Sequence, residues 1–254
     1  NWWQQNPTQF FQVLDQHVAW ARAHNIWIVF VMYTVPDGGN DCYEGYNVEC
    51  SIWETPAYQT EFQDFWEAMA EHFKDQPVVA GYDLINEPNP QEPDYCQTWF
   101  ALAQDVRAAV AAIAPNQLVF ISACSDPTLY QVFEEPSSPG TPARNIVYEV
   151  HDYDPIGLTH PGYNASGTDA EYPGDADTYY LGFVTLYWDA DTYNGTRYPD
   201  GYSTAKKYSI EWAMNNNVPI YVGEWGMQGW TPGHIQYVLD KGQLYRDLGV
   251  GHAY

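Results

Sequence analysis

The order of apolar and polar residues along the chain predicts helices that alternate with strands. Residues 8–25 repeat apolar side chains at intervals of three and four, which is the spacing of one helix face, and residues 26–33 are apolar almost throughout. The same pair of patterns recurs to the end of the chain. It predicts further helices at 55–73, 95–114, 204–217 and 233–247, a short helix near 176–189, and strands at 78–86, 118–122, 145–150, 219–224 and 249–254.

Strands that are apolar on both faces and separated by amphipathic helices indicate a parallel sheet covered by helices. Polar and aromatic residues collect after the strands, as they do on the catalytic face of a TIM (β/α)8 barrel. We therefore expect an α/β protein with this fold, and residues 1–254 to form one catalytic domain. Because only six strands are predicted and the chain opens on a helix, the barrel is expected to be incomplete at its N-terminus. A doubly wound sheet is the alternative, but no glycine-rich turn follows a strand to suggest a nucleotide site.

The net charge of this protein argues against two classes of binding partner. The chain has 33 acidic and 9 basic residues, with a formal charge of −24. Nucleic acids and anionic membranes would repel such a surface, so neither is expected as a partner. No run reaches the roughly 18 apolar residues of a membrane-spanning helix.

Four cysteines, Cys42, Cys50, Cys96 and Cys124, bear on the cellular compartment. None of them forms the CxxC spacing typical of a zinc site. We predict disulfides Cys42–Cys50 and Cys96–Cys124, with four reduced thiols as the alternative. Disulfides would indicate a secreted, extracellular protein.

Two glutamates stand at the ends of predicted strands. Glu87 lies in "VVAGYDLINEPNP" and Glu224 in "PIYVGEWG". The ends of parallel strands meet at one edge of a barrel, so both carboxyl groups are expected in one cleft, with Pro88 ending its strand so that Glu87 faces Glu224 across a sugar. Glycoside hydrolysis needs such a pair, because one group protonates the leaving oxygen while the other attacks or activates water. The alternative is that each is a structural residue of the rim.

The segments "GYDLINEPN", "YEVHDYDP" and "YVGEWG", in this order, resemble glycoside hydrolase family 5, the cellulase family of the large (β/α)8 glycosidase clan. The resemblance covers essentially the whole chain. It implies a retaining double displacement with Glu87 as acid/base and Glu224 as nucleophile. We expect no cofactor and no metal. Asn86 would donate to the sugar 2-hydroxyl and Tyr153 to Glu224, and His151 matches the family's active-site histidine.

Three aromatic residues complete the expected substrate site. Tyr33 stands where many family members carry a histidine soon after the third strand, which leaves the substrate open. Trp188 and Trp225 are candidate sugar platforms, with core packing as the alternative. The family's arginine on the second strand has no counterpart, and its tryptophan after "GHAY" would lie beyond Tyr254.

We expect a secreted, monomeric, retaining endo-β-1,4-glycanase that hydrolyses a cellulose-like β-linked polysaccharide. A β-mannanase or another β-glycosidase of the same family is the first alternative. A non-catalytic carbohydrate-binding barrel is the second. A metal-dependent hydrolase is the third and weakest, because no cluster of metal-ligating residues is apparent.

Overall fold

The computed structural model describes residues 2–36, 42–43, 51–88, 93–123, 145–153, 159–160, 213 and 217–254. The chain forms two compact units. The first comprises residues 1–127 and 133–147, and the second comprises residues 128–132 and 148–254. The expectation of a single catalytic domain stays a prediction. None of the helices within these ranges is long and apolar enough to cross a membrane.

The first unit contains three parallel strands in the order β1-β4-β5. The bounds of β5 are those predicted, whereas β1 and β4 are shorter than their apolar runs. Gly81 of β4 lies close against the backbone of β5, since a Cβ atom there would stand 2.2 Å from the carbonyl oxygen of Leu118. Glycine is required at this position because the obstacle is backbone, which cannot turn aside. The strands are β1 (Ile28–Val31), β4 (Val79–Asp83) and β5 (Leu118–Ser122).

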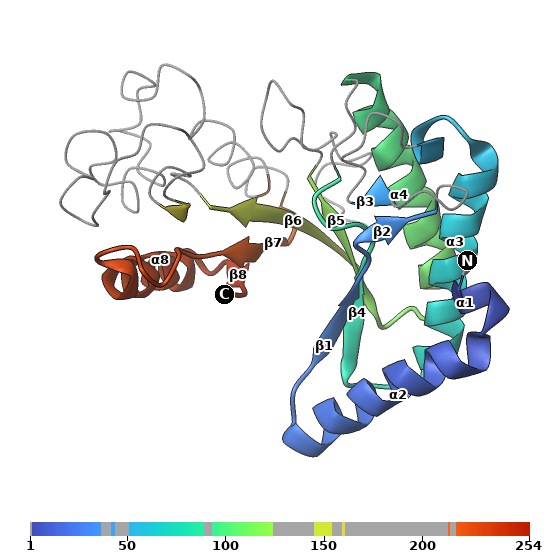
Figure 1. The fold of residues 1–254 in the computed structure, drawn as a ribbon, viewed down its shortest axis with the longest axis horizontal. Helices are drawn as coiled ribbons and strands as arrows, with labels where there is room; N and C mark the ends of the chain where they lie inside the picture. Colours follow the sequence, from blue (N-terminus) through green and yellow to red (C-terminus); the bar gives the residue numbers. More distant parts are fainter. Residues whose placement is uncertain are drawn as a thin grey trace. The chain divides into compact units, whose positions relative to one another are not determined.

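The helices of the first unit lie on one side of these strands (Figure 1). α2 and α3 each begin with a proline at the first helical position, where the missing N–H costs nothing. The C-cap of α2 is Asn25, whose φ of 56° is the left-handed conformation common at helix C-termini. The helices are α1 (Trp2–Gln5), α2 (Pro7–His24), the 3-10 turn η1 (Ser51–Trp53), α3 (Pro56–Phe73) and α4 (Pro93–Ile113).

The predicted apolar stripe of α3 forms the core of the first unit. The helical spacing places Phe62, Phe65, Trp66, Met69 and Phe73 on one face. Four of them are at most 1% exposed, and Phe65 is half-buried. The ring of Trp66 lies 5.6 Å from that of Tyr82 on β4, between ring centroids. Through these side chains α3 packs against the sheet. The predicted helix and its buried face are both confirmed.

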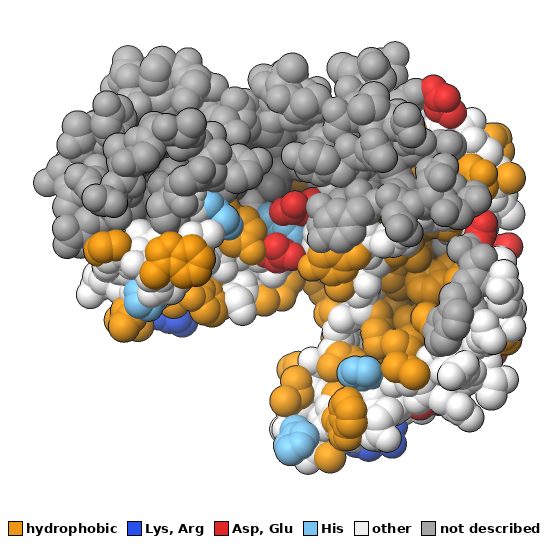
Figure 2. Space-filling model, viewed as in Figure 1, with side chains coloured by type: hydrophobic (Ala, Val, Ile, Leu, Met, Phe, Trp, Pro, Cys, Tyr) orange, Lys and Arg blue, Asp and Glu red, His pale blue; other side chains and the backbone are white. Residues whose placement is uncertain are grey.

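β1 differs from the prediction of a strand buried on both faces. Val29 and Val31 are 39% and 41% exposed, and only alternate residues of the strand are partly covered. Among the described residues β1 pairs with β4 on one side only, so half of its apolar run stays accessible. Other apolar side chains reach the surface nearby, at the end of α2 and the start of β1 (Figure 2). They are Trp20, Ile26 and Trp27.

A short antiparallel pair, β2 (Thr34–Val35) and β3 (Cys42–Tyr43), follows β1 and has no counterpart in the prediction. Two residues are too few for an alternating pattern to be read.

The second unit contains the parallel order β6-β7-β8, and its helix α8 lies against these strands (Figure 1). The C-cap of α8 is Gly249, which has a φ of 67° and donates its N–H back to the last turn. Of the predicted helices, 176–189 lies outside the described residues, and 204–217 is described only at residues 213 and 217. The elements are β6 (Ile146–Asp152), whose first two residues belong to the first unit, β7 (Ile220–Trp225), α8 (His234–Leu248) and β8 (Gly251–His252).

Candidate active site

A bulge in β7 sets the direction of Glu224. Val150 pairs with Val222, and the next residue of β6, His151, pairs with Glu224. Gly223 is therefore an extra residue in β7, opposite no partner of its own. Bulges often redirect a side chain next to an active site. Here the bulge brings Glu224 opposite His151.

Glu224 is held by two side chains of β6 and its C-terminal end. The hydroxyl of Tyr153 donates a hydrogen bond of 3.0 Å to Glu224 Oε2. His151 Nδ1 lies 3.5 Å from the same oxygen, and the Glu224 side chain keeps 31% of its surface exposed. A carboxylate that accepts from a phenol and still reaches solvent can act as a nucleophile or as a base. The structure thus brings together Glu224, His151 and Tyr153, three of the predicted site residues.

A second carboxylate, Glu149, lies behind His151 and was missed by the sequence reasoning. Glu149 is 3% exposed, and its Oε1 atom lies 3.9 Å from His151 Nε2. A Cβ atom on Gly223 would stand 1.7 Å from the same oxygen, so the glycine leaves the space that Glu149 fills. The signal was present in "YEVHDY", because residues two apart on a strand point to the same face.

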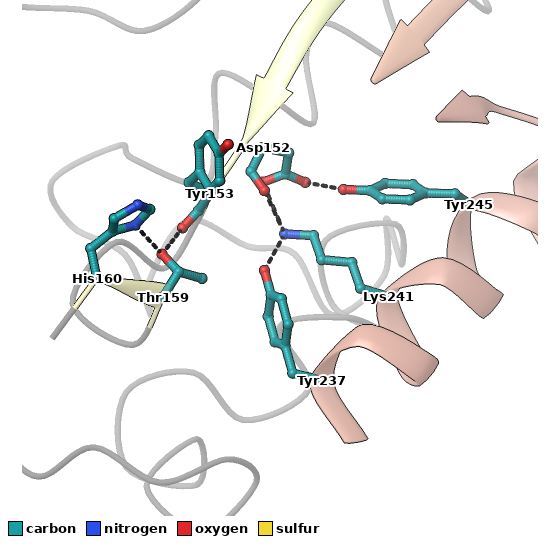
Figure 3. A network of polar contacts seen from close by, with 7 residues as sticks. All are labelled: Asp152, Tyr153, Thr159, His160, Tyr237, Lys241 and Tyr245. Atoms are coloured by element: carbon teal, nitrogen blue, oxygen red, sulfur yellow. Dashed lines mark hydrogen bonds and ion pairs between the residues drawn. The ribbon is translucent and has the colours of Figure 1, made fainter. Parts of the chain in front are cut away.

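A buried polar network continues from the end of β6 to α8 (Figure 3). Lys241 Nζ lies 3.0 Å from Asp152 Oδ1, and both side chains are at most 3% exposed. The hydroxyl of Tyr245 donates to Asp152 Oδ2 at 2.7 Å. Burying two charges removes their hydration at a large cost in free energy. A pair buried to this extent is therefore stable only when hydrogen bonds satisfy its remaining polar atoms. The sequence offered no signal for it, because the partners lie 89 positions apart.

Asn86 and Glu87 belong to the first unit, where they follow β4. The strand ends at Asp83, so the expectation that Pro88 ends it was wrong. Asn86 is 3% exposed and donates its backbone N–H to the carbonyl oxygen of Met32 at 2.8 Å. That bond ties the segment to the end of β1 although the regular ladder has stopped.

Glu87 has a strained backbone. Its φ is 44°, in the left-handed region that non-glycine residues seldom occupy. Such strain collects at functional sites, where the surrounding structure holds the residue in place. Glu87 is half-buried. The conformation supports a functional role for this glutamate on grounds independent of its sequence motif.

The remaining predicted residues have mixed outcomes. Tyr33 follows β1 and is 38% exposed, which suits a substrate contact, whereas Trp188 lies outside the described residues. Trp225 is 5% exposed and packs its ring against those of Tyr245, His252 and Tyr254. This burial favours core packing over the sugar platform for Trp225.

The predicted disulfide pairings are not tested. Cys96 is buried near the start of α4 and is disulfide-bonded. Cys50 and Cys124 lie outside the described residues, and only the backbone of Cys42 is described. Both pairings therefore stay predictions.

Comparison with curated proteins finds distant relatives that are glycosidases by name. The chain is 24% identical over 232 residues to Endoglucanase 3 of Fibrobacter succinogenes, which covers 85% of this chain and 33% of that protein. It is 25% identical to a beta-xylosidase of Phanerodontia chrysosporium, over 58% of this chain and 30% of that protein. An endoglucanase of Paenibacillus polymyxa is 25% identical, over 60% of this chain and 40% of that protein. The chain spans about a third of the length of these relatives.

Comparison with solved structures supports the expected barrel. Subunit Z of the clostridial cellulose synthase from Clostridioides difficile superimposes with a TM-score of 0.67 at 17% identity, covering 97% of this chain and 72% of that one. Endo-glycoceramidase II from Rhodococcus sp. gives 0.67 at 19% identity, with 97% and 60% covered. An endoglucanase from Thermotoga maritima gives 0.64 at 17% identity, with 97% and 70% covered. At these identities the likeness shows the fold.

The family model described as Cellulase (glycosyl hydrolase family 5) matches residues 3–241, which is most of the chain. The parallel strands and covering helices of each unit agree with an incomplete (β/α)8 barrel, as predicted. This protein belongs to glycosyl hydrolase family 5, the cellulase family.

Proposed function

We propose that this protein is a retaining endo-β-1,4-glycanase that hydrolyses a cellulose-like β-glucan. The observation that carries the proposal is the setting of Glu224, which accepts a 3.0 Å hydrogen bond from Tyr153 and lies 3.5 Å from His151 while keeping part of its surface exposed. The family match over residues 3–241 and the endoglucanases among the relatives support the substrate class.

In the proposed reaction Glu224 attacks the anomeric carbon while Glu87 gives its proton to the departing glycosidic oxygen. A covalent glycosyl-enzyme forms on Glu224. Glu87, now ionised, then takes a proton from water, which attacks the same carbon and releases Glu224 with net retention of configuration. The hydroxyl of Tyr153 keeps Glu224 aimed, and the side chain of Asn86 donates to the sugar 2-hydroxyl, where the bond strengthens as the ring flattens. The mechanism needs no cofactor.

A β-mannanase is the second candidate within the same chemistry. An endoglucanase from Thermotoga maritima, 17% identical to this chain, has been solved in complex with a mannotriose substrate. We assign the discrimination between sugars to Tyr33, which is exposed after β1. Other β-glycosidases of the family, and a non-catalytic carbohydrate-binding barrel, are the remaining alternatives.

We further propose that the protein is secreted and monomeric. The predicted disulfides support an extracellular site of action, because disulfides persist in oxidising compartments.

The test is hydrolysis of carboxymethyl-cellulose, glucomannan and xylan, measured as released reducing ends. The parent is compared with Glu87→Gln and Glu224→Gln. Glu71→Gln, on the exposed side of α3, is the matched control for loss of a carboxylate. We expect the parent and the control to degrade carboxymethyl-cellulose fastest and both site variants to lose activity by at least about 10³-fold. Equal activity in Glu224→Gln would refute the mechanism, and faster attack on glucomannan would favour the mannanase.

The two roles are separated with an aryl β-cellobioside and azide. Azide added to Glu87→Ala should intercept the glycosyl-enzyme and give the β-glycosyl azide. Azide added to Glu224→Ala should replace the nucleophile and give the α-glycosyl azide. The opposite pair of products would exchange the roles of Glu87 and Glu224.

A further inference from the structure

We propose that Lys241, Asp152 and Thr159 are positioning residues for this reaction, which hold Tyr153 where its hydroxyl donates to Glu224. The inference rests on the proposed function, in which Glu224 is the nucleophile. It assigns a role to a buried polar network that the steps of the reaction leave unused (Figure 3).

Lys241 is in the core of a chain that has few basic residues. It is 1% exposed, although the sequence contains only nine lysines and arginines against 33 acidic residues. Among the described residues its ammonium group contacts three oxygens, namely Asp152 Oδ1 at 3.0 Å, the carbonyl oxygen of Asp152 at 3.2 Å and the hydroxyl of Tyr237 at 2.9 Å. An ammonium has three hydrogens to donate, so each of these three oxygens can accept one.

Asp152 is held from both sides by one face of α8. Lys241 contacts Oδ1, and the hydroxyl of Tyr245 donates to Oδ2 at 2.7 Å. Tyr237, Lys241 and Tyr245 are spaced four residues apart, so they lie in one row along the helix. A rigid helix therefore fixes the last residue of β6 through both carboxylate oxygens.

Tyr153 lies one residue beyond β6, where the ladder of the sheet has ended. The carbonyl that Lys241 contacts belongs to the peptide bond joining Asp152 to Tyr153. The carbonyl oxygen of Tyr153 itself accepts a hydrogen bond from Thr159 Oγ1. Both peptide groups around Tyr153 are thus anchored by buried side chains, and the ring of His160 contacts the tyrosine ring at 5.0 Å between centroids. These anchors determine where the Tyr153 hydroxyl meets Glu224.

A purely structural ion pair would have a different signature. It would stabilise the packing of α8 on β6, and its loss would lower the melting temperature without acting through Tyr153. A positioning role instead requires the loss in kcat to depend on the Tyr153 hydroxyl, because that hydroxyl is the group being placed.

The experiment is a double-mutant cycle. Lys241→Met and Asp152→Asn are combined, so that no unpaired charge remains buried. This pair and Thr159→Val are each introduced into the parent and into Tyr153→Phe. Gln236→Ala, on the exposed face of α8, is the control. The kcat and KM for an aryl β-cellobioside are measured at a temperature where circular dichroism shows every variant folded.

In the parent we expect the Lys241→Met/Asp152→Asn pair to lower kcat about tenfold with KM within about twofold, and in Tyr153→Phe we expect no further loss. An equal loss in both backgrounds would overturn the inference. The Tyr153–Glu224 distance in a crystal structure of the pair is the readout that needs no turnover. We expect it to exceed 3.5 Å, and an unchanged 3.0 Å contact would also overturn the inference. If the parent hydrolyses no glycan, the proposed function is refuted. The Tyr153–Glu224 distance in the variant then decides the positioning role without any measurement of turnover.

Discussion

Gly223→Ala is expected to destabilise the second unit through a clash with Glu149. The new methyl group would stand 1.7 Å from Glu149 Oε1, whereas ordinary contacts begin at 3.4 Å, so the carboxylate must retreat by about 1.7 Å. Overpacking of this kind costs about 1–3 kcal/mol, and pulling a buried carboxylate from its neighbours costs a further 1–3 kcal/mol or so. With a total of about 3 kcal/mol, the melting temperature should fall by about 6–12 °C.

The assay is thermal unfolding followed by circular dichroism. Gly229→Ala is the matched control, because nothing lies within 4 Å of a Cβ atom at that position, and it should melt within about 2 °C of the parent. The double variant Gly223→Ala/Glu149→Ala should recover part of the loss, since the obstacle is removed. The reasoning is refuted if Gly223→Ala alone melts like the control.

Three further predictions concern single side chains. Tyr153→Phe removes a hydrogen bond to a charged group, worth about 1.5–3 kcal/mol, so kcat on an aryl β-cellobioside should fall about 10- to 150-fold with KM little changed; unaltered kcat would contradict the role given to the Glu224 contact. Gly81→Ala sets a Cβ atom 2.2 Å from the backbone oxygen of Leu118 and should lower the melting temperature by at least about 6 °C, or prevent folding, and a normal melt would show that β4 and β5 can separate. Asn25→Ala should cost about 1 kcal/mol in urea unfolding because φ is 56°, while Asn25→Gly should be neutral; equal values for the two would exclude backbone strain as the cause.

The periodic patterns predicted most of the described helices and strands. β5 has its predicted bounds, and α3 buries the stripe that its spacing indicated, because a helix or strand must turn its apolar side chains toward the core whatever lies opposite. The predicted ends were less accurate. β4 stops at Asp83, four residues before Glu87, because the ladder loses its regular pairing although Asn86 still bonds to Met32.

Exposure of β1 could not be predicted from its own residues. An apolar run is compatible with burial on both faces. Whether Val29 and Val31 are buried depends on which residues from elsewhere in the chain pack against them. Sequence pattern therefore described the strand correctly and its surroundings incorrectly.

The candidate site divides in the same way. Glu224, His151 and Tyr153 could be named from the sequence, because each follows or ends an apolar strand in a motif that resembles the cellulase family. Which atoms meet was decided by the tertiary structure: the bulge at Gly223 sets Glu224 opposite His151, and α8 brings Lys241 to Asp152 across 89 positions of sequence. Local pattern encodes which face of an element is apolar. Contacts between distant residues depend on strand register and helix placement, which only the packed chain defines.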